Sequence, residues 1–262
     1  MDKKLQEGLG SFSDSREATI NNRWDKCRIG ITGANGSLGR ALTKCLRDKG
    51  AFIIGITHGP IPREQTSSTQ PQEWVSWQCG QEESPDKTLS ELDILVLNHG
   101  INPKGRQSTN DLNEAIEINA LSTWRLIERF ETVMPNDQHY LQPREIWVNT
   151  SEAEIQPALS PGYEISKRLI GQLVSLKWSN FKKDQHKTLK IRKLVLGPFL
   201  SDLNPIGIMS AGFVANQVIR QAELGLSLII VSPNPITYIL MPLSEILRAI
   251  YSGLTRIMFR AN

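Results

Sequence analysis

Tyr163 and Lys167 stand four residues apart in "SPGYEISK", directly after a Ser-Pro-Gly turn signal. On a helix this spacing places a phenol beside an ammonium group. A free tyrosine titrates near pH ~10, and a neighbouring positive charge favours the phenolate and lowers that pKa. The pair could exchange a proton with a carbonyl or alcohol oxygen, or it could be an ordinary surface contact on a helix.

Three other places along the chain carry polar groups that could join such chemistry. Ser151 follows the apolar "EIWVNT" and could bind a substrate oxygen or cap a turn. Asn119 lies within a predicted helix that asparagine does not favour, so it has either a local polar role or a hydrogen-bonded place in the core. Asn98-His99-Gly100 is either a turn beneath a cofactor or an ordinary strand end.

The segment "ITGANGSLGRAL" contains glycines at 33, 36 and 39 between a predicted strand and a predicted helix. Glycines so placed let the backbone approach a pyrophosphate at the helix N-terminus. A tight turn that needs glycine only for steric reasons is the alternative. The strand–turn–helix context favours a dinucleotide.

The elements that must position these residues alternate along the chain. Apolar runs predict seven strands, at 27–32, 51–57, 73–79, 92–98, 145–150, 191–197 and 226–231. Helical spacing predicts helices at 40–50, 110–134, 161–178 and 209–224. The pattern predicts an α/β fold, a single-domain, Rossmann-like, doubly wound parallel sheet of about seven strands with helices on both faces. Ligands of such sheets bind beyond the carboxyl ends of the strands.

Composition limits the function classes. The chain has 262 residues, with 30 basic and 27 acidic side chains, a balance that does not indicate nucleic-acid binding. Three cysteines without C-x-x-C spacing indicate neither disulfides nor zinc, and fit a reducing compartment. Because no secretory signal and no run of 18 apolar residues is found, a cytoplasmic location is expected. Residues 1–25 are predicted to be a poorly ordered tail, and 26–262 one domain.

The order of these motifs resembles that of the short-chain dehydrogenase/reductase family, from about residue 27 to 200. Within it, the chain is most similar to the dehydrogenase part of proteins described as bifunctional sterol desaturase/short-chain dehydrogenase. The desaturase part is not expected here, because the four histidines are scattered. The resemblance implies that Tyr163 is the general acid or base, Lys167 tunes it, Ser151 binds the substrate oxygen and Asn119 anchors a water.

The same resemblance implies a nicotinamide cofactor and no metal. Its contacts are expected from the glycine turn, from the ends of later strands and from Lys167. They are Gly33, Asn35, Gly36, Ser37, Leu38, Gly39, His58, Asn98, His99, Gly100, Lys167, Pro198 and Ser201. No acid occurs from Lys49 to Arg63, where an acid would bind the ribose of NAD, and Arg40, His58 and Arg63 lie nearby. NADP(H) is therefore favoured over NAD(H).

Several residues depart from the family's pattern. His99 replaces the alanine of Asn-Ala-Gly, and we interpret it as a hydrogen-bonded spacer rather than a substrate group. Glu152 competes with Ser151 for the family's serine position. The acid usual after the third strand is replaced by "QCGQE" (78–82), and the next helix is expected to be short.

Substrate contacts are expected in residues 201–262, a loop followed by an apolar segment. From Pro242 the apolar residues fall on one helical stripe: Leu243, Ile246, Leu247, Ile250, Leu254, Ile257 and Met258. Three interpretations compete for this stripe, which are packing on the domain, an oligomer interface and peripheral membrane contact through 236–260. Packing or homo-oligomerisation is favoured over membrane.

The prediction from sequence is thus an oxidoreductase, an NADP-dependent carbonyl reductase or alcohol dehydrogenase, acting on a small molecule that could be lipophilic. A catalytically silent nucleotide-binding protein, serving as redox sensor or assembly partner, is the alternative. An epimerase or dehydratase of nucleotide sugars fits the glycine spacing, but the long C-terminal substrate domain usual in those enzymes is not found.

Overall fold

The computed structural model describes residues 22–61, 67–133, 143–180 and 188–260, apart from the side chains of 180 and 256–260. Seven parallel strands form one sheet in the order β3-β2-β1-β4-β5-β6-β7. They are β1 Arg28–Thr32, β2 Phe52–Thr57, β3 Glu73–Ser76, β4 Ile94–Leu97, β5 Arg144–Ser151, β6 Leu189–Leu196 and β7 Leu228–Val231. The strand order reverses direction between β1 and β4, which is where dinucleotides bind in such sheets. The predicted fold class is confirmed.

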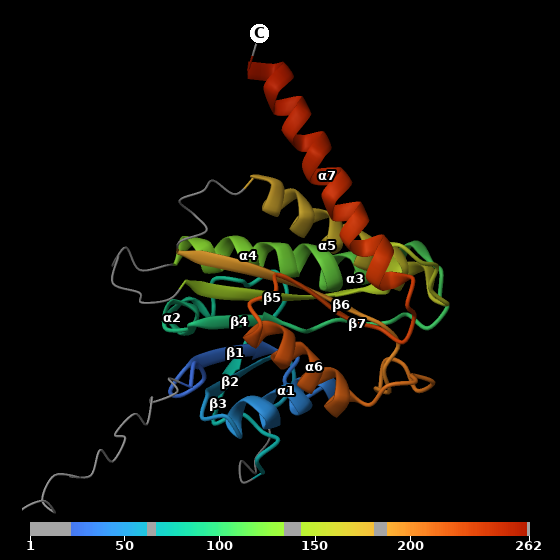
Figure 1. Cartoon of the computed structure of the whole chain (residues 1–262). Helices are drawn as coiled ribbons and strands as arrows, with labels where there is room; N and C mark the ends of the chain where they lie inside the picture. Colours follow the sequence, from blue (N-terminus) through green and yellow to red (C-terminus); the bar gives the residue numbers. More distant parts are fainter. Residues whose placement is uncertain (1–21, 62–66, 134–142, 181–187, 261–262) are drawn as a thin grey trace, which may run out of the picture.

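Helices cover both faces of the sheet (Figure 1). One face carries α1 Ser37–Arg47 and α6 Ala211–Glu223, and the other carries α3 Thr109–Ile116, α4 Ser122–Thr132 and α5 Pro161–Asn180. The short helix expected after the third strand is α2 Asp86–Ser90, and η2 Glu152–Glu154 follows β5. Each face has its own apolar core, and both cores include strand residues that are completely buried, such as Ile31 and Ile146. Burial on both faces explains the nearly unbroken apolar runs of the central strands.

The predicted helix 110–134 is interrupted. Between α3 and α4 the chain widens into a π-helical turn, η1 Glu117–Leu121, which contains Asn119. Met134, at the predicted end, lies outside the described residues. Single π-turns inserted in longer helices often occur at functional sites.

The ordered domain begins earlier than the predicted boundary at residue 26. Trp24 is buried, its ring lies edge-on to Trp147 at 6.0 Å, and its Nε1 donates to Glu223 at 2.7 Å. Residues 1–21 of the predicted tail lie outside the described part of the chain. Burying a tryptophan stabilises a domain by several kcal/mol, about 3–5 by truncation to alanine, which explains why this short polar segment is ordered.

The last helix, α7 Thr237–Arg260, leans away from the rest of the molecule along its length (Figure 1). The interpretation that its apolar stripe packs on the domain is wrong for the described part. Leu243, Ile246, Leu247, Ile250 and Leu254 are all exposed, whereas Met241 is buried against Val195 and Ile230. The side chains of Ile257 and Met258 lie outside the description. Among the helices that the structure describes, none has the length and apolar character needed to cross a bilayer.

Candidate active site at the carboxyl edge of the sheet

The predicted site residues come together because their strands are neighbours. β1, β4 and β5 lie side by side and run in the same direction, so the segments that follow them emerge at one edge of the sheet. The segments after β1 and β4 hold Gly33 and Asn98-His99-Gly100, and Ser151 is the last residue of β5. The N-terminal part of α5, with Tyr163 and Lys167, begins at the same edge (Figure 1).

The glycine turn after β1 is shaped for close backbone approach. Gly33 has a φ of +64°, a conformation that side chains disfavour. A Cβ on Gly39 would lie 2.3 Å from the carbonyl oxygen of Gly33, so only glycine fits there. α1 begins after Gly36 without a side-chain cap and without an acid in its first turn, so its first backbone N–H groups remain available to an anion. The turn therefore fits the pyrophosphate of a dinucleotide.

The other residues predicted in this turn differ in what they offer. Leu38, in the first turn of α1, is buried, and its side chain packs in the apolar core. Ser37 is the first residue of α1, and the carbonyl of Asn35 accepts a hydrogen bond from Arg40. Only the backbone of Leu38 could meet a cofactor.

Asn98 links the glycine turn to α5 through a chain of hydrogen bonds. Its Nδ2 donates to the Gly33 carbonyl at 3.4 Å, and its Oδ1 accepts from Asn149 at 2.9 Å. The carbonyl of Asn149 in turn accepts from Lys167 Nζ at 2.9 Å. Asn149, which the sequence analysis missed, thus couples the two halves of the site. Asn149 stands between buried residues of β5. A polar residue within this apolar strand could have indicated from the sequence that Asn149 has a role in the site.

His99 is a buried spacer, as interpreted from the sequence. Its Nδ1 lies 2.8 Å from Thr32 Oγ1 and its Nε2 lies 2.9 Å from Ser122 Oγ. Because Ser122 donates its own proton to the Ile118 carbonyl, we assign the ring proton to Nε2. Burial, with the charge of Lys167 adding, lowers the pKa of His99 to about 3. His99 is therefore a neutral imidazole with a hydrogen bond at each ring nitrogen, and it links β1 to the start of α4.

Asn119 has its side chain fully engaged at the π-turn. Its Oδ1 accepts from the Ile101 amide at 2.7 Å, and its Nδ2 donates to the Ile101 carbonyl at 3.0 Å and to Ser166 Oγ at 2.8 Å. Both amide hydrogens are therefore used. Asn119 fastens the loop after β4 to α5 from a buried position. A water bound to Asn119 would therefore have to donate a hydrogen bond to the side-chain or backbone carbonyl oxygen of Asn119.

Ser151, Tyr163 and Lys167 form the centre of the site. The Ser151 hydroxyl lies beside the Tyr163 hydroxyl, close enough to favour the phenolate. Ser151 Oγ donates to the Leu196 carbonyl at 3.4 Å and accepts from the Ala153 amide at 3.2 Å. Lys167 Nζ lies 5.8 Å from the centroid of the Tyr163 ring. Ser151 and Lys167 are buried and Tyr163 is half-buried. The phenol thus faces the end of β5 rather than bulk solvent.

The electrostatics of this centre differ from the sequence expectation. The pKa of Tyr163 is raised, not lowered, because burial disfavours the phenolate; the neighbouring Ser151 hydroxyl opposes this, and the Glu152 carboxylate adds to it. Lys167 is itself buried, and this burial lowers the pKa of its ammonium group to about 8. The expected lowering of the phenol's pKa by the neighbouring ammonium is therefore not found, and burial sets the direction of the shift. Tyr163 carries its proton at neutral pH in this state.

Glu152 is a further acid at the site. Its Oε2 accepts hydrogen bonds from Ser232 and, at 3.3 Å, from Thr237 at the start of α7. Its side chain is turned toward β7 and α7, and it does not replace Ser151 beside the phenol. The competition between these two residues is thus resolved by the direction of their side chains.

The remaining predicted contacts lie around the same edge. His58 is exposed just beyond β2, and Arg40 is exposed on the first turns of α1, whereas Arg63 lies outside the described residues. Beyond β6, the Pro198 carbonyl accepts from the Ile208 amide at 3.1 Å, and Ser201 Oγ accepts from the Asn204 amide at 3.1 Å. The loop that follows β6 is therefore closed on itself by its own hydrogen bonds.

Elsewhere in the described chain, no group of three or more histidine, cysteine or acidic side chains is arranged to hold a metal ion. The three cysteines are free thiols. A separate buried ion cluster lies beneath α7, where Lys193 Nζ contacts Glu154 at 2.6 Å and Glu245 at 2.8 Å. The sequence offered no signal for this cluster, because its members are far apart in the chain.

The sequence and the fold are similar to those of known epimerases and dehydrogenases. In the collection of curated proteins, monoglucosyldiacylglycerol epimerase of Synechocystis sp. is 42% identical over 229 residues. The alignment covers 86% of this chain but 53% of the relative, so the chain spans about half the relative's length. The likeness to sterol desaturase fusion proteins stays a prediction.

Solved structures show the same fold at low identity. Aldohexose dehydrogenase of Thermoplasma acidophilum, in its ligand-free form, superposes with a TM-score of 0.64 at 15% identity, over 80% of this chain and 93% of that one. A short chain dehydrogenase of Burkholderia cenocepacia in complex with NADP gives a TM-score of 0.66 at 14% identity, over 90% and 98% of the two chains. A sequence model matches residues 29–176, and by that match the chain belongs to the NAD dependent epimerase/dehydratase family.

Proposed function

We propose that this protein inverts a hydroxyl-bearing carbon in the sugar of a glycolipid, by oxidising it to a ketone and reducing it again from the opposite face. The observation that carries the proposal is the Ser151–Tyr163–Lys167 centre beside a glycine turn that fits a pyrophosphate. The family and the name of the Synechocystis relative support an epimerase on a lipid-linked sugar. The substrate is taken from that name by analogy.

The proposed proton steps use this chain's own residues. Ser151 hydrogen-bonds the reacting oxygen. The Tyr163 phenol first gives its own proton to solvent, and the resulting phenolate takes the hydroxyl proton as the carbinol carbon becomes a carbonyl. A bound nicotinamide cofactor would supply the hydride chemistry, as temporary acceptor and donor for that carbon. Tyr163 returns the proton to the oxygen when the carbonyl is reduced on its other face. Proton and hydride are both restored, so the epimerisation is neutral in redox terms.

Lys167 has the donors to serve both partners. An ammonium group has three N–H bonds, and the hydrogen bond to the Asn149 carbonyl uses one. The others can meet ribose hydroxyls of the cofactor, as the family resemblance implies. Since Asn149 is tied through Asn98 to the glycine turn, the position of this ammonium is coupled to the pyrophosphate site.

NADP(H) is the cofactor that we propose, in preference to NAD(H). Arg40 is exposed on the first turns of α1, and no acid stands at the end of β2, where the exposed His58 lies. A 2′-phosphate would be attracted by Arg40 and would meet no carboxylate among the described residues 51–61.

A net carbonyl reductase is the second candidate. The observation that favours it is the raised pKa of Tyr163, because a phenol that holds its proton at neutral pH is ready to protonate a carbonyl oxygen. The two candidates share every residue of the site. They differ in whether reduced cofactor is consumed.

The test is to incubate the purified chain with monoglucosyldiacylglycerol in detergent micelles and NADP⁺ far below the substrate concentration. An epimerase converts the headgroup sugar many times per cofactor without net change in nicotinamide absorbance. A reductase, tested with carbonyl compounds, oxidises one NADPH per product. Tyr163→Phe should lower either activity about 10³-fold, with cofactor affinity retained. Full activity of the Tyr163→Phe variant would exclude both.

A further inference from the structure

α7 exposes its apolar side and buries its polar one. The exposed apolar residues of the helix are Tyr238, Ile239, Leu240, Leu243, Ile246, Leu247, Ile250, Tyr251 and Leu254. At 3.6 residues per turn, those from Ile239 to Leu254 fall within an arc of ~140°. Leu247 and Ile250 are 58% and 55% exposed. An apolar arc of this length on the outside of a domain marks a contact surface.

The opposite side of the helix is the one that holds it to the domain. Met241 is buried, and the carboxylate of Glu245 accepts from Lys193 Nζ at 2.8 Å and from Ser175 Oγ at 2.7 Å. Lys193 is completely buried and also contacts Glu154. Because a buried charge is costly unless it is paired, this cluster fixes which face of α7 is turned inward. The apolar arc is therefore kept facing outward.

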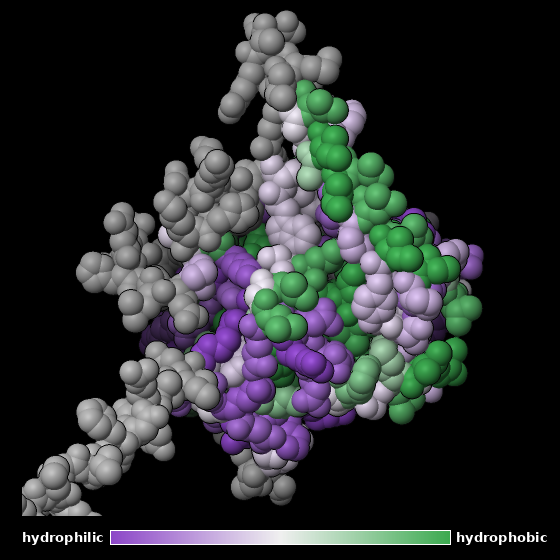
Figure 2. Space-filling view, in the orientation of Figure 1, coloured by the Kyte–Doolittle hydropathy of each residue, from purple (hydrophilic) through white to green (hydrophobic). Residues whose placement is uncertain are grey.

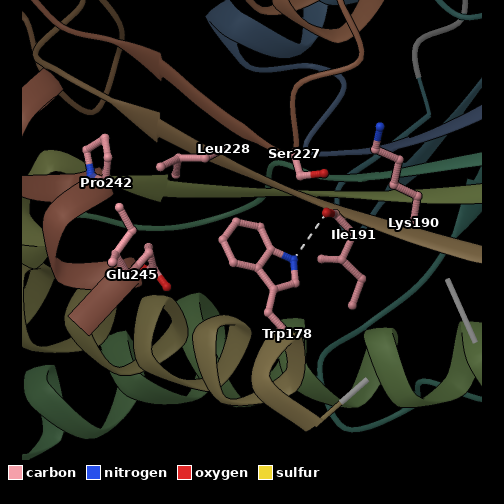
Figure 3. Close-up of a pocket in the computed structure, with 8 residues that line it drawn as sticks. Trp178, Lys190, Ile191, Ser227, Leu228, Pro242 and Glu245 are labelled. Atoms are coloured by element: carbon pink, nitrogen blue, oxygen red, sulfur yellow. Dashed lines mark hydrogen bonds between the residues drawn. The ribbon is translucent and has the colours of Figure 1, made fainter. Parts of the chain in front are cut away.

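Two hollows flank the line where α7 meets the domain. One, of about 350 Å³, lies between α7 and the starts of β6 and β7; Figure 3 shows Trp178 across it from Pro242 and Glu245, with its Nε1 donating to the Ile191 carbonyl at 3.2 Å. The other, of about 650 Å³, runs from Ile155 along Leu243 and Leu247 to Tyr251. Contact with the domain is thus confined to a narrow strip of the helix.

Further exposed apolar residues lie in the loops after β6 and before α5, near the carboxyl edge of the sheet. Leu203, Ile206, Ile208 and Phe213, in the loop after β6 and at the start of α6, are exposed, and Leu159 before α5 is 88% exposed. Figure 2 shows hydrophobic residues along α7 and over the side of the molecule where these loops lie. We call these loop residues and the exposed apolar residues of α7 the apolar collar.

Charge distinguishes between the partners that could cover the apolar collar. α7 contains one acid, Glu245, which is bound to Lys193, and three arginines, Arg248, Arg256 and Arg260. By helical spacing all three arginine positions fall outside the apolar arc, and Arg248 hydrogen-bonds Gln172 of α5. A helix that combines an apolar face with more arginines than acids suits a surface of anionic lipids, whereas a symmetric second copy would bring like charges together.

We propose that the apolar collar binds the surface of a bilayer that contains anionic lipids, with α7 lying in the plane of the interface. This places the carboxyl edge of the sheet against the headgroups, so that a lipid-linked sugar can reach Ser151 and Tyr163 from the membrane. The proposed membrane contact is inferred from the exposed face and the charges of α7. Only the delivery of a lipid-linked substrate depends on the proposed function.

The test is sedimentation of the full chain with vesicles of phosphatidylcholine, with and without 30 mol% (about one third) phosphatidylglycerol. The wild type should pellet with the anionic vesicles, less at high salt. Leu247→Glu/Ile250→Glu should abolish pelleting, and Arg248→Gln should weaken it about fivefold. Leu224→Glu, at a 70% exposed leucine after α6, is the matched control and should pellet like the wild type. Equal thermal melting of all variants would establish that they are folded.

Two results would overturn the proposal. One is a wild type that stays in the supernatant with anionic vesicles. The other is a stable dimer in light scattering that Leu247→Glu/Ile250→Glu converts to a monomer, which would assign the apolar collar to a second copy. Tyr163→Phe should still pellet, and Leu247→Glu/Ile250→Glu should still turn over a water-soluble glycoside if the wild type does. Failure of the membrane surface and failure of the proposed function are therefore separate outcomes.

Discussion

Lys167 places its ammonium nitrogen 5.8 Å from the centroid of the Tyr163 ring, and both groups are altered by the burial that they share. Burial raises the pKa of the phenol and lowers that of the ammonium to about 8. Each group is thus shifted toward its neutral form. Burying the Lys167 ammonium costs desolvation free energy. Such a buried charge is typical of a functional centre and not of a surface helix pair.

Lys167→Met should remove activity and increase stability at neutral pH. The ammonium is buried with a pKa near 8 in place of 10.5, so its charge destabilises the native state below pH 8. We expect a gain of about 2 kcal/mol at pH 7, since one pKa unit corresponds to about 1.4 kcal/mol and the lost hydrogen bond to Asn149 offsets part of it. Urea unfolding at several pH values would measure it.

The pH dependence of that gain has a definite sign. Between pH 8 and 10.5 the unfolded wild type binds a proton that the native state does not, so wild-type stability rises with pH there. The advantage of Lys167→Met should therefore shrink above pH 8. Lys44→Met, on an exposed position of α1, should stay within about 0.5 kcal/mol of wild type. A less stable Lys167→Met at pH 7 would contradict the argument.

His99 should make the protein sensitive to mild acid. Its pKa is lowered to about 3, chiefly by burial, whereas an ordinary histidine titrates near 6.5. Below pH 6.5 the unfolded chain therefore binds a proton that the native state refuses, and stability falls by up to about 1.4 kcal/mol per pH unit. His99→Ala should be less stable at pH 7 because of the cavity, but its stability should fall less steeply between pH 6.5 and 4. Parallel slopes in urea unfolding would contradict this.

The sequence predicted the fold because the features that decide it are local. Apolar runs marked the buried strands, and the glycine spacing marked the turn that Gly33 and Gly39 require. The spacing of Tyr163 and Lys167 predicted their meeting on α5, but not the balance of burial and charge that sets their pKa values. That balance depends on side chains from several elements.

Contacts between distant elements could not be read from the chain. Asn119 in the π-turn bonds Ile101 and Ser166, which lie on other elements. The outward orientation of the α7 stripe is set by Glu245 and the buried Lys193. An amphipathic helix has the same sequence pattern whether its apolar face is turned to its own domain or away from it.

Gly39→Ala should disrupt the glycine turn. The added Cβ would lie 2.3 Å from the Gly33 carbonyl oxygen and 2.7 Å from Ala34 Cα, both of them backbone atoms. We expect a loss of about 1–3 kcal/mol from overpacking and a loss of cofactor binding. Gly212→Ala is the control, because a Cβ there meets no atom within 4 Å and lies in α6; it should stabilise by up to about 1 kcal/mol. Thermal melting and titration with NADPH would measure both, and unchanged NADPH binding by Gly39→Ala would contradict the assignment.

Arg40→Ala should weaken the binding of NADPH more than that of NADH. Arg40 is exposed on the first turns of α1, and its guanidinium donates a hydrogen bond to the Asn35 carbonyl. A charge-assisted contact to a 2′-phosphate is worth about 1.5–3 kcal/mol, so the Kd for NADPH should rise at least tenfold while that for NADH changes little. Lys44→Ala, one turn along the same helix and paired with Asp48 at 2.6 Å, controls for the general loss of positive charge. Because high salt screens this contact, the preference for NADPH should also narrow as ionic strength rises in the wild type but not in Arg40→Ala. Equal loss of affinity for both cofactors would mean that Arg40 shapes the turn and does not select the phosphate.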